Sequence, residues 1–110
     1  MDISFASSKL KRQCTEERLL VRTHGTQRAK LIRRRLDDVA AVETLADLKH
    51  LPGRWHELQE NRKGQLSVDL DGPYRLILTP EGEGKYKPDG GLDWTLVRAV
   101  CVHGVEDTHE

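Results

Sequence analysis

The sequence predicts an α+β domain in which two N-terminal helices pack on one small sheet of mostly antiparallel strands. Apolar residues recur every three or four positions between about residues 9 and 42, as they do along one face of a helix. After residue 65 they alternate with polar residues or form short runs, as in strands. An alternating segment at residues 2–7 adds a first strand, so the expected order is β-α-α-β-β-β. At 110 residues the chain supports one modest core, and residues 1–110 are expected to form a single domain.

The first strand and the first helix are expected before residue 25. Residues 2–7 alternate apolar and polar side chains, which is typical of a half-buried strand. Ser7-Ser8 then offers an N-cap for a helix over residues 9–23, and Gly25 is suited to end it. Thr15 is also a plausible cap, so the helix could break and restart there. The apolar stripe of this helix consists of Leu10, Cys14 and Val21.

A second helix is expected from Thr26, which can cap it, to about residue 42. Its apolar stripe consists of Ala29, Ile32, Leu36, Val39 and Ala40. Arg33, Arg34 and Arg35 are expected to spread over the exposed side. Residues 44–49 predict one further short turn, which ends at the Pro52-Gly53 pair.

The C-terminal half predicts three strands. Residues 65–70 alternate, with Leu66, Val68 and Leu70 expected to face inward. A turn at residues 71–73 leads to a second strand at residues 74–79, so the two form a hairpin. The Gly- and Pro-rich stretch 80–91 is expected to be an exposed loop, and the β-branched run 94–105 a long buried strand.

The bulk composition excludes several classes of protein. Charged residues make up 33% of the chain, hydrophobic residues 36%, and the mean hydropathy is −0.65, which predicts a thin core and a charged surface. No apolar run is long enough to cross a bilayer, and the N-terminus lacks a signal-peptide pattern, so we expect a cytoplasmic protein. Five aromatic residues are too few for a platform that stacks several unpaired bases. Cys14 and Cys101 match no zinc spacing and are expected to be buried free thiols.

The net charge of zero conceals two oppositely charged halves. Residues 1–36 contain ten Lys and Arg against three Asp and Glu, a balance of +7. The remaining residues contain eight against fifteen, a balance of −7. A cationic face of this kind suits nucleic acid or an acidic partner, although it could equally be a solvated helix pair beside an acidic sheet edge.

Residues 54–78 contain side chains that suit chemistry on a phosphodiester. Cleavage of RNA by its own 2′-hydroxyl needs a base, an acid and cations that stabilise the phosphorane. Histidine serves for both proton transfers, and arginine grips phosphate oxygens in pairs. His56 precedes the hairpin and Arg75 interrupts an apolar strand, whereas Arg62 and Lys63 precede Gly64 in a predicted bend. Each of these residues alone could instead belong to a solvated surface, and His24, His50 and His103 are expected to be structural or incidental. No metal-ligand spacing is present, so no metal or other cofactor is expected.

Taken together, these segments resemble a known family. The pattern His56-x-Leu, Arg62-x-Gly-x-x-Ser and Tyr74-Arg-Leu-Ile is similar to the central hairpin of HigB-like toxins, a branch of the RelE/ParE toxin superfamily. The ending Glu-Asp-Thr-His109 resembles the closing Asp-Tyr-His of that family, and residues 88–94 look like a subgroup often labelled killer or killer-suppression proteins. The match covers nearly the whole chain and implies a RelE-like fold.

The resemblance implies the toxin of a type II toxin–antitoxin pair, an mRNA interferase that cuts the codon exposed in the ribosomal A site without a metal. Its expected partners are the ribosome with its mRNA and a helix-turn-helix antitoxin similar to HigA. Operator DNA would be bound only through that antitoxin, and no membrane is expected.

The resemblance also implies roles for individual residues. His56 and His109 become the general acid and base candidates, Arg75 the phosphate clamp, and Asp107 an orienting or proton-handling carboxylate. Arg62 becomes a supporting cation that could instead bind backbone or Asp69. RNA-binding cations are expected at Arg62, Lys63, Arg33 and Arg34, although the basic helices could instead receive the antitoxin.

Two positions depart from the family pattern. Thr108 stands where the family commonly has Tyr, and Gln59 stands where some relatives have Lys. Either change could lower activity, which leaves open a non-catalytic interaction module that binds an antitoxin and aids operon repression. A gyrase-directed toxin of the ParE kind is a further alternative, and the presence of His56 and His109 speaks against it.

Overall fold

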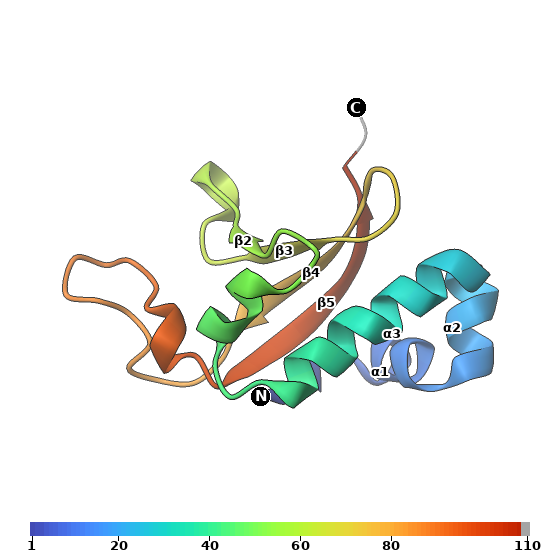
Figure 1. The fold of residues 1–110 in the computed structure, drawn as a ribbon, viewed down its shortest axis with the longest axis horizontal. Helices are drawn as coiled ribbons and strands as arrows, with labels where there is room; N and C mark the ends of the chain where they lie inside the picture. The colour runs from blue at the N-terminus through green and yellow to red at the C-terminus, as the bar shows by residue number, and fades with distance from the viewer. Residues whose placement is uncertain (109–110) are drawn as a thin grey trace.

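The computed structural model describes residues 1–108, and its centre is a mixed sheet with helices packed on one side (Figure 1). Within that range the sheet has five strands, in the order β1-β5-β4-β3-β2. Strand β1 pairs with β5 in parallel, and every other neighbouring pair is antiparallel. The predicted α+β class and the antiparallel-dominated sheet are therefore confirmed. The strands are β1 (Asp2–Phe5), β2 (His56–Glu57), β3 (Leu66–Asp69), β4 (Tyr74–Pro80) and β5 (Ala99–Asp107).

The helical layer contains three helices where two were predicted: α1 (Ser8–Thr15), α2 (Glu17–His24) and α3 (Thr26–Ala41). Ser7 caps α1, because its Oγ accepts a hydrogen bond of 3.1 Å from the Leu10 amide. The chain is extended at Glu16, which divides the predicted first helix. The division has a packing reason, since positions 14 and 20 of one straight helix would point about 120° apart. With the break, Cys14 and Leu20 are both buried.

Three short 3₁₀ turns complete the described part of the chain: η1 (Leu45–His50), η2 (Glu60–Arg62) and η3 (Trp94–Leu96). The first corresponds to the turn predicted at residues 44–49. The third corrects the prediction that a strand begins at residue 94. The Asp93 carboxylate accepts a hydrogen bond from the Thr95 amide, which starts a helical turn, and β5 begins only at Ala99.

The core lies between the helices and one face of the sheet. The fully buried side chains include Leu20, Ile32, Val39, Leu66, Val68, Leu76, Leu78, Val100 and Val102. Two predictions for α3 were wrong in detail. Ala40 is exposed, whereas Arg35, predicted on the solvent side, is only 7% exposed. The reason is that α3 crosses close to the end of β3, where a backbone carbonyl accepts the Arg35 Nε–H.

A bulge in β5 reverses which side chains face the core. The register shifts between Ile77 and Leu78, so that Ile77 lies opposite Gly104 and Leu78 opposite Val102. His103 is the extra residue, and its Nε2 lies 2.8 Å from the Thr79 hydroxyl. Beyond the bulge Val105 packs against the core and Glu106 faces away from it, whereas strict alternation from Val102 would give the opposite.

Both cysteines are free thiols, but the prediction that both are buried is correct only for Cys14. Cys14 is buried, and burial raises the pKa of its thiol, whereas Cys101 is only partly buried. Among the described residues no group of three or more metal-ligating side chains is present. None of the helices in that part of the chain is long and apolar enough to cross a membrane.

Candidate active site on the open face of the sheet

Charged residues of alternating sign form a row across the sheet face that the helices leave uncovered. Arg75 lies opposite Asp69 on one side and Glu106 on the other. The Asp69 amide bonds the Gly53 carbonyl, which continues the β2–β3 pairing and places Arg54 beside Asp69. We call Arg54, Asp69, Arg75 and Glu106 the charged row, and the face that carries them the open face. Opposite charges at directly paired positions stabilise a sheet.

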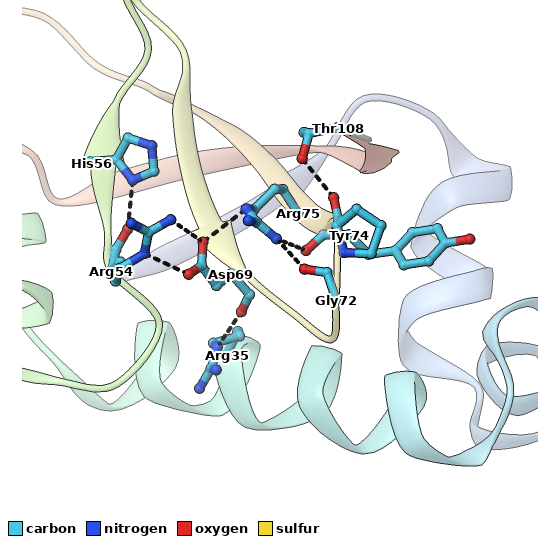
Figure 2. A network of polar contacts seen from close by, with 9 residues as sticks. Arg35, Arg54, His56, Asp69, Gly72, Tyr74, Arg75 and Thr108 are labelled. Carbon is cyan, nitrogen blue, oxygen red and sulfur yellow. Dashed lines mark hydrogen bonds and ion pairs between the residues drawn. The ribbon is translucent and has the colours of Figure 1, made fainter. Parts of the chain in front are cut away.

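Asp69 is shared between two arginines of this row (Figure 2). Its Oδ2 accepts a hydrogen bond of 2.7 Å from the Nε of Arg54, and its Oδ1 lies 2.9 Å from the Nε of Arg75. The Nη1 of Arg75 also donates to the carbonyls of Gly72 and Tyr74, both at 2.8 Å. The Arg75 side chain is 19% exposed and the Arg54 side chain 72% exposed. Arg75 is therefore held rigidly, while Arg54 extends into solvent.

Arg35 supports the same aspartate from the helix side. Its Nε donates a hydrogen bond of 3.0 Å to the Asp69 carbonyl, and Figure 2 shows it rising from α3 beneath the strand. Gly53 leaves the room that this contact requires. A Cβ at Gly53 would lie 2.9 Å from the Arg35 Nε and 2.5 Å from a methyl group of Val68. The position of the charged row therefore depends on the buried Arg35 guanidinium and on the close approach of the Gly53 backbone to it.

Arg62 is bound to Glu106, not to Asp69 or backbone, the two partners considered from the sequence. Its two terminal nitrogens donate to the two carboxylate oxygens of Glu106 at 2.7 and 2.6 Å, and its Nε donates to Gln65 at 3.0 Å. This ion pair lowers the pKa of Glu106, because the guanidinium favours the charged carboxylate. Lys63 follows in the same loop and is exposed, at a cleft of about 500 Å³ that Tyr86 and Lys87 also line.

His56 lies on the open face with a defined tautomer when neutral. It pairs with Ser67, two positions from Asp69 on β3, so the imidazole shares the face of the charged row. Its Nδ1 lies 2.6 Å from the carbonyl oxygen of Arg54. A carbonyl only accepts, so Nδ1 must carry the proton, and Nε2 of the neutral ring then holds the lone pair. Arg54 has a φ of 51°, which is uncommon for a residue with a side chain.

The turn between β3 and β4 connects this face with the helices and the end of β5. Its Asp71 carboxylate binds Arg28 of α3 at 2.9 and 3.2 Å, and that guanidinium lies 3.3 Å from the centre of the Tyr74 ring. Arg28 lowers the pKa of Asp71 through this hydrogen bond. On the other side, the amide and hydroxyl of Thr108 donate to the Pro73 carbonyl at 2.9 and 2.7 Å. Thr108 therefore ties the end of β5 to the turn.

The structure brings together only some of the residues selected from the sequence. His56 and Arg75 share the open face. Asp107 is exposed at the end of β5, and its pairing with Tyr74 places it on the face opposite to Arg75. His109 lies outside the described residues.

The two arginines predicted to bind RNA lie on α3, away from the charged row. Arg33 forms an ion pair with Glu17 of α2, and Arg34 is exposed. Their helical layer is rich in cations, with ten Lys and Arg against four Asp and Glu over residues 8–41. It is the part of the molecule that carries the positive half of the charge balance.

Arg54 was missed from the sequence, and Asp69 and Glu106 were not anticipated as the acidic members of the row. Their alignment depends on strand β2, which has only two residues and no alternation to detect. One signal was present: Leu70 and Tyr74 flank the predicted turn, so Asp69 and Arg75, one position further along each strand, are expected to lie opposite each other.

The fold is shared with solved toxin structures. A YoeB/ParE toxin from Agrobacterium tumefaciens superposes with a TM-score of 0.60 at 12% sequence identity, and the match covers 100% of both chains. A YoeB dimer from Staphylococcus aureus gives a TM-score of 0.56 at 14% identity, covering 100% of this chain and 97% of the other. No protein-family model and no curated protein matches the sequence. The chain therefore has the fold of these YoeB and YoeB/ParE toxin structures.

Proposed function

We propose that this protein is the toxin of a type II toxin–antitoxin pair, a HigB-like, metal-independent endoribonuclease that cleaves mRNA on the ribosome. The observation that carries the proposal is the position of His56, whose Nε2 is left without the proton when the ring is neutral. It lies on the same sheet face as the Arg75 guanidinium, within a fold shared with YoeB/ParE-like toxins.

The chemistry follows from these positions. Nε2 of His56 removes the proton of the 2′-hydroxyl, whose oxygen then attacks the adjacent phosphorus. Arg75 stabilises the added negative charge of the phosphorane, and a guanidinium held in place beforehand does this without reorganisation. The second histidine, His109, is the candidate acid that protonates the departing 5′-oxygen, with Asp107 as an orienting carboxylate. Arg62 and Lys63 then serve as neighbouring cations for the RNA backbone.

A toxin of this kind has defined partners. A helix-turn-helix antitoxin similar to HigA would neutralise the toxin, and operator DNA would be contacted only through it. The basic helical layer, including Arg33 and Arg34, would either dock on ribosomal RNA or receive that antitoxin. A cytoplasmic location follows from a substrate that is being translated.

The test is to map mRNA 5′ ends in a reconstituted translation reaction, with wild-type protein and with Arg75→Ala. The proposal expects new ends within A-site codons for the wild type, at least about a hundredfold fewer for the variant, and none without ribosomes. Folded wild-type protein that produces no new ends would contradict it. Arg98→Ala is a matched control, because Arg98 is an exposed arginine that precedes the opposite end of β5.

One observation favours a second candidate, a non-catalytic module that binds an antitoxin. Arg54, Arg62 and Arg75 each form an ion pair within the protein. Under this candidate the wild-type protein would be harmless when expressed alone and would still bind the product of a neighbouring antitoxin gene. Growth arrest that depends on Arg75 would exclude it.

A further inference from the structure

We propose that Arg54 is a second phosphate-binding residue and that Asp69 is the internal counter-ion that holds it beside Arg75. The ligand class is one phosphodiester of single-stranded RNA, so the inference rests on the proposed function for its substrate. It adds to that function a two-arginine phosphate site, of which the sequence patterns revealed only one member.

The net charge of the site suits a single anion. One carboxylate, Asp69, faces two guanidiniums, one on each of its oxygens. The three side chains together carry one excess positive charge, and a phosphodiester carries one negative charge. Glu106, the other carboxylate of the charged row, is paired with Arg62, so the five side chains together still carry one excess positive charge. A bound phosphodiester would therefore neutralise the cluster.

The exposure of the donors makes Arg54 available to a ligand. Arg54 bonds Asp69 mainly through Nε at 2.7 Å, with Nη2 3.5 Å from the other oxygen. A guanidinium has five N–H donors, so the remaining ones of this 72% exposed side chain face solvent. Arg75 is more enclosed and fixed by two carbonyls. Arg54 is thus the member of the pair that an incoming RNA strand meets first.

Arg54 is also connected to His56. The backbone of Arg54 holds the imidazole through its carbonyl, while its side chain holds Asp69 (Figure 2). Arg54, whose backbone is in a left-handed conformation, therefore fixes the position of the proposed general base, His56, and of its own guanidinium. A phosphate gripped by Arg54 and Arg75 lies on the face where Nε2 of His56 can reach the neighbouring ribose.

The test measures binding, not cleavage. A short single-stranded RNA with 2′-O-methyl groups throughout cannot be cut by its own 2′-oxygen, and its affinity is measured between low and moderate salt. Arg54→Ala is expected to weaken binding about tenfold and to reduce the salt slope, log K against log salt, by about 0.7. Asp69→Asn removes the competing charge but keeps an oxygen acceptor, so it should tighten binding and steepen the slope. Arg98→Ala, at an exposed arginine distant from the site, should change neither.

The variants separate binding from folding. Arg54→Ala keeps the carbonyl that holds His56 and the same strained φ, and thermal unfolding of each variant verifies the fold. Arg54→Lys restores charge without the planar fork and should recover only part of the affinity. Arg54→Ala with wild-type affinity and salt slope would overturn the inference, as would wild-type protein that does not bind the RNA. If wild-type protein cuts no mRNA but Arg54→Ala still loses RNA binding, the proposed function fails and this site stands.

Discussion

Gly53 and Arg35 show how strongly one residue can determine the position of the charged row. Gly53 has a φ of +120° and approaches both Val68 and the Arg35 guanidinium too closely for any side chain. Its carbonyl accepts the Asp69 amide at 2.7 Å, so it also sets the alignment of Arg54 with Asp69. The glycine is therefore required by backbone conformation and by packing at once.

Gly53→Ala is accordingly expected to lower the free energy of unfolding by about 3 kcal/mol, the sum of a left-handed backbone and an overpacked contact. Gly64→Ala is the matched control, because Gly64 also has a positive φ, +95°, but no atom lies within 4 Å of the place that a Cβ would occupy. It should cost about 1 kcal/mol. Urea unfolding of both variants checks the prediction, and equal losses would refute the steric part.

The Asp71–Arg28 ion pair predicts how stability depends on pH. The hydrogen bond from Arg28 lowers the pKa of Asp71 in the folded protein. The pair therefore stabilises the fold fully at pH values above the pKa that Asp71 has in the unfolded chain. That contribution is lost as the pH falls through the lower pKa of the folded protein. Asp71→Asn should cost about 1 kcal/mol at neutral pH and nothing once the carboxylate is protonated in both states. Unfolding measured from neutral to strongly acidic pH tests this. Arg28→Gln should make the free energy of unfolding less dependent on pH over the same acidic range. If both variants kept the pH dependence of the wild type, the Asp71–Arg28 pair would not be its source.

Single residues also show where the sequence was and was not informative. His56 and Arg75 could be selected by residue type, because histidine and arginine suit phosphodiester chemistry. The burial of Arg35 could not, since it depends on where α3 crosses the end of β3. The partner of Arg62 could not either, because Glu106 is 44 residues further along the chain and only the fold brings the two together.

At the scale of elements, the helical layer depends on the cap that starts α1. The Ser7 hydroxyl satisfies the Leu10 amide, one of the donors that a helix leaves unpaired at its start. Ser7→Ala should therefore lower the free energy of unfolding by about 1 kcal/mol. Ser8→Ala, at the first residue of the helix, should have little effect because alanine is a good helix former. Thermal unfolding distinguishes them, and equal effects would show that the cap contributes nothing.

The elements that could be predicted are those with a clear period. The hairpin of β3 and β4, helix α3 and the start of α1 all match the sequence patterns closely. Strand β2 was missed because two residues carry no period, and the start of β5 was misplaced because the apolar run at residues 94–98 includes a capped turn. The break at Glu16 was predicted only as an alternative, because Thr15 could either lie within one continuous helix or cap a second one.

At the scale of the whole molecule, charge is divided between the two layers. The helices hold most of the excess cations, whereas Arg54, Arg62 and Arg75 each form an ion pair with an acid, two of them with the same aspartate. The helical surface proposed to attract RNA and the site proposed to bind one phosphate are therefore different regions. The excess charge is visible in the sequence, but its division between these regions is not, because the fold decides which charges meet.

If the helical layer docks on ribosomal RNA, Arg34 should contribute more than Arg33. Arg33 is already paired with Glu17, whereas Arg34 is exposed. Arg34→Ala is expected to weaken association with ribosomes several-fold at low salt and less at high salt, because the attraction is to phosphates. Arg33→Ala should have a smaller effect. Cosedimentation with ribosomes at two salt concentrations measures both, and no loss for Arg34→Ala would favour this layer as the antitoxin-binding surface.

The bulge at His103 divides β5 into two halves of opposite phase. The first half directs Val100 and Val102 to the core, and the second directs Val105 there and Glu106 toward Arg62. Deleting His103 would join Val102 to Gly104 with the pairing of both halves unchanged, so the longest strand should accept a shortening by one residue at this point. Deleting Val105 instead would exchange the inward-facing and outward-facing positions of the residues that follow it in β5. In evolutionary terms, His103 is the place where this sheet could gain or lose a residue without exchanging its inner and outer faces.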